Sequence, residues 1–183
     1  GYGGGRGIHG DSYIGQWKNS KAEGYGVHTW LDGDRYEGEW KECLRHGNGT
    51  DFFANGDVYV GQYDIGKPSG YGQYKWSNGN SYTGEFNLGM KHGKGKWKKV
   101  PTDLSDKNRF NSYDGYYEMD KKHGYGTFCW ESDNKYIGNY HYNDLQGYGT
   151  MYWTDGSHFK GHWIKGVQHG VGIMNFPDGS KRA

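Results

Sequence analysis

Residues 36–58 read YEGEWKECLRHGNGTDFFANGDV and residues 59–81 read YVGQYDIGKPSGYGQYKWSNGNS. Both stretches open on aromatic-x-Gly-x-aromatic, carry Gly-x-Gly eleven residues after the opening aromatic, and have Asn-Gly near their ends. An internal period of this kind is the sequence signature of a repeat protein, so it decides the fold. The opening aromatics along the chain are Tyr13, Tyr36, Tyr59, Tyr82, Tyr113, Tyr136 and Phe159.

The spacing of these aromatics sets the domain boundaries. It is 23 residues throughout, except for 31 residues between the fourth and fifth repeats. Seven repeats therefore span residues 13–181, and the extra eight residues form an insertion within 98–112 that should protrude from one edge. Residues 1–12 are in phase with the C-terminal half of a preceding repeat, so we expect the chain to be cut from a longer protein.

Each repeat is predicted to form two antiparallel strands. In the first strand Tyr36, Gly38 and Trp40 alternate with Glu37 and Glu39, which places aromatic rings and glycine on one face and polar side chains on the other. Aliphatic residues are scarce, since only 32% of the chain is hydrophobic while it holds 35 Gly, 18 Tyr and 8 Trp. We therefore expect aromatic rings to replace an aliphatic core.

The turn between repeats fixes the predicted register. A two-residue turn at Asp32-Gly33 would place Tyr36 on the wrong face, whereas a three-residue type I turn over 31–33 with a left-handed glycine pairs His28 with Tyr36. The same register places Gly24 opposite Trp40, where we expect the glycine to give the large ring room. The predicted fold is all-β: an elongated, single-layer antiparallel meander of stacked 23-residue hairpins, which is a solenoid.

The pattern Tyr-x-Gly-x-Trp, followed by Gly-x-Gly in a 23-residue unit that ends in Asp-Gly or Asn-Gly, resembles the MORN (membrane occupation and recognition nexus) repeat family. The resemblance covers essentially the whole chain. It implies a twisted single-layer sheet that serves as a binding or dimerisation module. Members of the family occur in membrane-contact proteins, phosphoinositide kinases, ciliary radial spokes and the protist cytoskeleton. The repeat carries no catalytic residues in that family.

No arrangement of residues predicts an enzyme, a metal site or a cofactor site. The glycine motif at Gly5–Gly10 leads into a strand, whereas a dinucleotide fingerprint must open a helix. The histidines that precede Gly-x-Gly are separated by two strands or more, which is too far to share a metal ion: His46, His92, His123 and His169. Cys43 and Cys129 lie too far apart to form a disulfide, which favours a reducing compartment.

The aromatic face predicts a protein partner. An exposed aromatic surface of several hundred Å² normally marks a binding site. We expect an amphipathic helix or an extended peptide to lie along the central repeats, and the unpaired end strands to allow a homodimer. The protein-binding residues predicted from the register are Trp40, Phe53, Tyr63, Tyr74, Trp76, Phe86 and Trp97.

Charge offers an alternative partner. The chain has a formal net charge of +1, which argues against nucleic acid, but residues 86–122 carry nine basic and five acidic residues. Anionic phospholipids would bind this local excess through Lys94, Lys96, Lys98 and Lys99. The alternative interpretation is a solvated lysine edge that prevents strand pairing. Either partner fits a cytoplasmic protein associated with the cytoskeleton or a cilium, or with the cytoplasmic face of a membrane.

Overall fold

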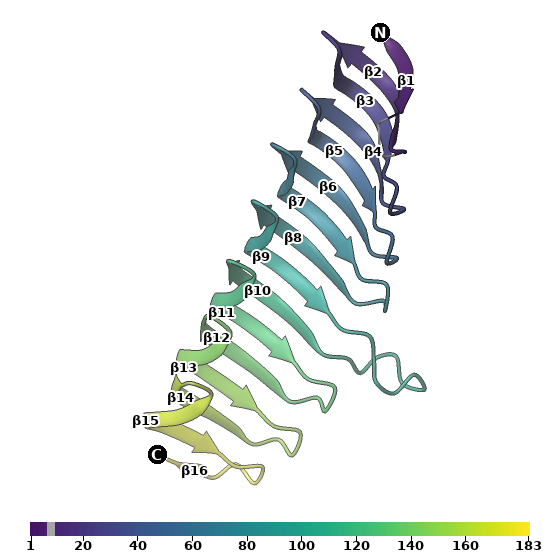
Figure 1. Ribbon diagram of the computed structural model, residues 1–183. Coiled ribbons are helices and arrows are strands. Elements are labelled where there is room, and N and C mark those ends of the chain that lie inside the picture. The colour runs from purple at the N-terminus through teal and green to yellow at the C-terminus, as the bar shows by residue number, and fades with distance from the viewer. Residues whose placement is uncertain (7–9) are drawn as a thin grey trace. The chain divides into compact units, whose positions relative to one another are not determined.

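The computed structural model describes residues 1–6 and 10–183, and these residues form sixteen antiparallel strands in one sheet whose order follows the chain (Figure 1). Residues 7–9, which belong to the 1–12 segment and to the Gly5–Gly10 motif, lie outside the described residues. None of the described residues forms a helix able to cross a membrane. The strands are β1 (Tyr2–Arg6), β2 (Ser12–Lys18), β3 (Lys21–Thr29), β4 (Arg35–Lys41), β5 (Leu44–Phe52), β6 (Val58–Asp64), β7 (Lys67–Lys75), β8 (Ser81–Asn87), β9 (Met90–Lys98), β10 (Ser112–Glu118), β11 (Lys121–Cys129), β12 (Lys135–His141), β13 (Asp144–Tyr152), β14 (His158–Ile164), β15 (Val167–Asn175) and β16 (Lys181–Arg182).

The chain divides into two compact units. Unit 1 comprises Gly1–Met90 and contains β1 to β8, and unit 2 comprises Lys91–Ala183 and contains β9 from its second residue through β16. From β2 onward, consecutive strands within each unit are joined by short turns, apart from the long connection between β9 and β10 (Figure 1). We describe the two units separately.

The turn between repeats has the predicted geometry. Residues 31–33 form a three-residue loop, closed by a hydrogen bond from the Trp30 amide to the Asp34 carbonyl of 2.9 Å, and Gly33 is left-handed with φ of 99°. The β3–β4 register pairs His28 with Tyr36. The predicted all-β fold, turn and register are therefore confirmed.

A second turn, inside each repeat, was not predicted. β4 and β5 are joined by Glu42 and Cys43, which both have positive φ, at 49° and 65°. Two successive left-handed residues define a type I′ turn, whose twist matches that of antiparallel strands. Neither residue is glycine, so the pairing of Lys41 with Leu44 on either side holds this backbone in place.

The glycines serve a different ring from the one predicted. A Cβ atom on Gly26 would collide with the Tyr13 ring, so this glycine forms the slot for the opening aromatic of the repeat. Gly24 has φ of +80° and its nearest side chain is Gln16 rather than Trp40. The prediction that Gly24 makes room for Trp40 is therefore wrong. A glycine is needed there because a left-handed backbone occurs where β2 and β3 shift register.

Candidate binding surface on the aromatic face

The opening aromatics define what we call the inner face of the sheet. Tyr36 and Tyr59 are fully buried, and each hydroxyl donates a hydrogen bond to the backbone carbonyl three residues ahead, at 2.8 Å. Burial raises the pKa of both hydroxyls well above the usual value, and the corresponding Tyr136 in unit 2 has a pKa raised to about 12. These rings are the floor of the inner face and are inaccessible to a partner.

A second ring in each first strand packs edge-on against the floor. The Trp40 ring lies 4.9 Å from that of Tyr36 and 5.5 Å from that of Tyr13, both in T-shaped geometry. Tyr63 and Phe86 repeat this packing and, like Trp40, are less than 9% exposed. Three of the predicted binding residues therefore lie on the predicted face but serve as core, because each ring is enclosed by opening aromatics of two repeats.

The remaining predicted residues form a half-buried row at the end of each second strand. In unit 1 the Tyr74 ring lies 5.9 Å from Phe53 and 4.8 Å from Trp76. The Tyr74 hydroxyl donates to buried Asp57 at 2.6 Å, and this bond is the main cause that lowers the pKa of Asp57. In unit 2 Trp97 is also half-buried, with its ring 6.2 Å from Phe128. These rings offer accessible aromatic surface.

The structure adds residues of repeats 1 to 3 that were absent from the prediction. A hollow of about 450 Å³ in unit 1 is lined by the predicted Trp40 and by residues that include Trp17, His28, Trp30, Leu44 and Ile65. Trp30 lies 23 residues before Phe53 and 46 before Trp76, so the repeat spacing could have identified it. Burial lowers the pKa of His28, which favours a neutral ring at this mostly apolar surface.

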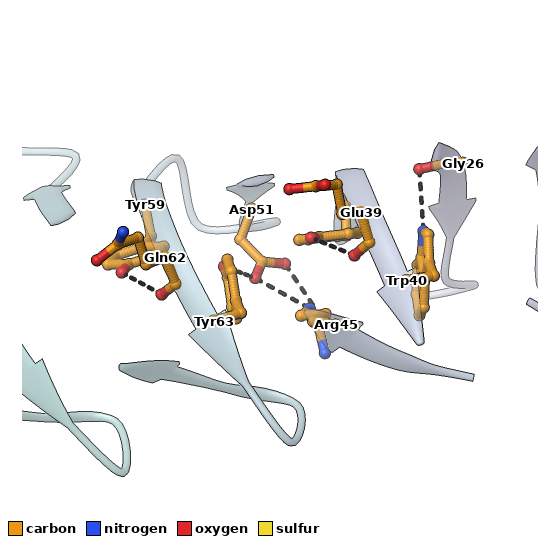
Figure 2. A network of polar contacts seen from close by, with 9 residues as sticks. Gly26, Glu39, Trp40, Arg45, Asp51, Tyr59, Gln62 and Tyr63 are labelled. Carbon is orange, nitrogen blue, oxygen red and sulfur yellow. Dashed lines mark hydrogen bonds and ion pairs between the residues drawn. The ribbon is translucent and has the colours of Figure 1, made fainter. Parts of the chain in front are cut away.

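An ion pair between the buried Asp51 and the partly exposed Arg45 stabilises the inner face beside the hollow. Asp51 accepts from the Tyr63 hydroxyl and contacts Arg45 through two 3.0 Å distances, to Nε and to a terminal nitrogen (Figure 2). The Arg45 guanidinium also lies 4.6 Å from the Trp30 ring and 5.3 Å from the Tyr36 ring. Burial first, and then the charge of Asp51, raises the pKa of Tyr63. The charges of Arg45 and Asp51 thus neutralise each other.

The opposite, outer face holds three of the four predicted lipid-binding lysines. Lys94, Lys96 and Lys98 are exposed on one face of β9, whereas Lys99 follows the strand with the opposite parity. Lys96 lies 3.7 Å from Asp114 and Lys98 lies 4.5 Å from the Phe110 ring. Lys96 and Lys98 therefore already make contacts within the chain.

Solved structures with a distant likeness to this chain include a TCP domain and a TCP10 domain. The TCP domain of SAS-4 (dCPAP) from Drosophila melanogaster, in complex with a proline-rich motif of Ana2 (dSTIL), is 15% identical, covers 88% of this chain and 84% of its own, and has a TM-score of 0.48. The wild-type TCP10 domain of Danio rerio CPAP is 11% identical, covers 96% of this chain and 89% of its own, and has a TM-score of 0.31. Likeness at these scores supports no inference about this chain. No curated protein sequence matches it.

The repeat itself matches a sequence family. The sequence model of the MORN repeat family matches residues 13–35, 36–58, 59–81, 82–100, 113–135, 136–158 and 159–181. Each matched segment opens on one of the buried aromatics that form the floor of the inner face. The chain belongs to the MORN repeat family.

Proposed function

We propose that this chain is a non-enzymatic scaffold that binds segments of a partner protein on its inner aromatic face. Repeats of this family mediate interactions with proteins or membranes. The single observation that carries the proposal is the hollow of about 450 Å³ in unit 1, where tryptophan rings line a mostly apolar surface. Rigid aromatic side chains that keep accessible area are typical of binding hot spots.

An amphipathic helix or an extended peptide matches this surface, because either can present apolar side chains to a row of rings. The core residues Trp40, Tyr63 and Phe86 stabilise the face, and the accessible rings Trp30, Phe53 and Trp76 make the contacts. Tyr74 contributes its ring, while its hydroxyl stays on Asp57. A place at the cytoskeleton, a cilium or a membrane contact in the cytoplasm is part of this proposal, and it rests on family membership.

The test selects peptides from a phage-displayed random library on the whole chain and on the Trp30→Ser/Trp76→Ser variant. We expect peptides rich in apolar residues to be enriched on the wild type and lost on the variant. The matched control is Tyr25→Ser/Tyr71→Ser, which removes two rings of unit 1 that are 52% and 60% exposed on the outer face. Enrichment that survives the inner-face variant, or that depends on the control pair, would contradict the proposal.

The exposed lysines of β9 favour anionic phospholipid as a second candidate ligand. A lysine near an anionic bilayer contributes about 1 kcal/mol, and salt weakens the attraction. Reversal of Lys94, Lys96 and Lys98 to Glu should therefore abolish pelleting with phosphatidylserine vesicles at low salt. The control reverses Lys67 and Lys75, which are exposed in β7 of unit 1. Unchanged pelleting of the β9 variant would remove this lipid site.

A further inference from the structure

Lys122 occupies in repeat 5 the position that Arg45 occupies in repeat 2. Each follows the type I′ turn of its repeat and pairs with the second inner-face ring, Lys122 with Tyr117 and Arg45 with Trp40. Arg45 has Asp51 as its counter-ion, and the residue that corresponds to Asp51 in repeat 5 is Phe128. The same cationic position is thus neutralised within the chain in unit 1 and faces an aromatic ring in unit 2.

Aromatic rings surround the Lys122 ammonium group. Its Nζ lies 5.6 Å from the centre of the Phe128 ring, 5.8 Å from that of Tyr140 and 5.9 Å from that of Tyr113. No carboxylate of the described residues lies within 4 Å of this Nζ. The described inner-face positions of β9 to β15 hold glycine, aromatic, aliphatic, glutamine and lysine residues, but no Asp or Glu.

The ammonium group is therefore short of a suitable partner. Ring faces attract a cation, but they do not replace the strong acceptors that three N–H donors require. Burial first, and then the positive charge of Lys91, lowers the pKa of Lys122, which means that the charged form is disfavoured there. A carboxylate placed above these rings would supply the missing acceptor and favour the charged form of Lys122.

We propose that Lys122 binds an Asp or Glu side chain of the partner, so that the inner face of unit 2 recognises an acidic segment with apolar residues on both sides of the acid. The inference rests on the proposed function and specifies the chemistry of its partner. The intramolecular Arg45–Asp51 pair shows that a carboxylate can bind to a cation at this position of the repeat. Unit 2 as a whole carries fourteen Lys and Arg against ten Asp and Glu, which attracts an acidic partner.

A protein segment fits this position better than a lipid headgroup. Lys122 is half-buried among the rings, and its neighbours Phe128 and Tyr140 would contact the apolar residues that flank the acid. A bilayer surface would instead meet the exposed lysines of the outer face, such as Lys94 and Lys96. Binding of phosphatidylserine vesicles should therefore be unaffected by Lys122→Met.

The test repeats the peptide selection on the wild type, on Lys122→Met and on Lys160→Met. Methionine keeps the length and apolar stem of lysine but removes the charge, and Lys160 is an exposed lysine of β14 in the same unit, which provides a control of equal charge. We expect wild type and Lys160→Met to enrich peptides with Asp or Glu between apolar residues. Lys122→Met should lose this acidic class, and Lys122→Arg should retain it.

One enriched peptide and its Glu→Gln or Asp→Asn form are then compared by fluorescence anisotropy. Neutralising either the peptide or Lys122 should weaken binding about tenfold or more, and combining both changes should weaken it no further. Enrichment without acidic residues, an acidic class that survives Lys122→Met, or vesicle binding that Lys122→Met abolishes would overturn the inference while peptide binding as such stands. Absence of any enriched peptide would overturn the proposed function as well.

Discussion

Asp51 occupies the position of its repeat at which the preceding repeat carries His28 and the following repeat carries Tyr74. A carboxylate among aromatic rings is costly unless it is paired and hydrogen-bonded. Here it is satisfied by Tyr63 and by both Arg45 contacts, and Figure 2 shows both side chains directed at it. Each charge of the Arg45–Asp51 pair is therefore compensated by the other.

Removing one member should therefore destabilise unit 1 more than removing both. Asp51→Asn leaves the Arg45 guanidinium without its counter-charge. We expect a loss of about 2 kcal/mol in unfolding free energy, below the value for a fully buried pair because the Arg45 side chain is 25% exposed. Urea unfolding followed by circular dichroism measures it.

The matched variant is Arg45→Met/Asp51→Leu, which replaces the pair by apolar residues of similar size. Its loss should be smaller than that of Asp51→Asn. Equal losses for the two variants would show that packing, rather than charge pairing, sets the contribution of Asp51.

Two elements that depart from the repeat meet in the structure of unit 2. The insertion before β10 approaches the β11–β12 turn, where Thr102 donates to Glu131 at 2.8 Å and Arg109 lies 3.1 Å from Asp133. Asp133 stands where other repeats have the turn glycine, and its φ is 71°. Asp133 thus adopts a backbone conformation that favours glycine, and its carboxylate is in contact with Arg109 of the insertion.

The insertion should nevertheless be dispensable for folding. Its ion pair with the turn is exposed, and such pairs contribute at most about 1 kcal/mol, while shortening a loop reduces the entropy cost of closure. We expect replacement of residues 100–110 by a three-residue turn with Asn-Gly, which removes the eight extra residues, to leave the melting temperature within a few degrees. Arg109→Ala is the control for the ion pair alone. Aggregation of the shortened chain, with Arg109→Ala unaffected, would assign the insertion a structural role.

At the level of the whole molecule, charge and strand edges both bear on self-association. Unit 1 carries eight Lys and Arg against eleven Asp and Glu, whereas unit 2 has a net positive charge. The first and last strands of the sheet, β1 and β16, each pair with one neighbour. An unpaired strand edge is a template for pairing with a second chain.

We expect sedimentation velocity to detect dimers of this chain that increase with protein concentration. If the units of opposite charge attract each other between molecules, dimers should decrease as salt rises from about 0.05 to 0.5 M. The control is the chain with Lys160 and Lys165 of unit 2 reversed to Glu, which should dimerise less. A monomer at every concentration would contradict association through the sheet edges.

Sequence alone predicted the repeat, the inter-repeat turn and the register. These features depend on neighbours within one hairpin: Asp32-Gly33 accepts only one turn that keeps Tyr36 on the aromatic face. The inner-face position of Trp40, Tyr63 and Phe86 followed from the same alternation. Their depth of burial did not, because it depends on rings supplied by the preceding repeat.

The 23-residue period and the alternation of side chains thus determined the family, the all-β fold and the face on which the aromatic rings lie. The tertiary structure decided which rings stay accessible, which charges are neutralised and which departures from the repeat touch each other. Asp51 neutralises Arg45, while Lys122 at the same repeat position lies among rings. A periodic pattern specifies where a side chain points, but its environment is built by residues of adjacent strands, and these vary from repeat to repeat.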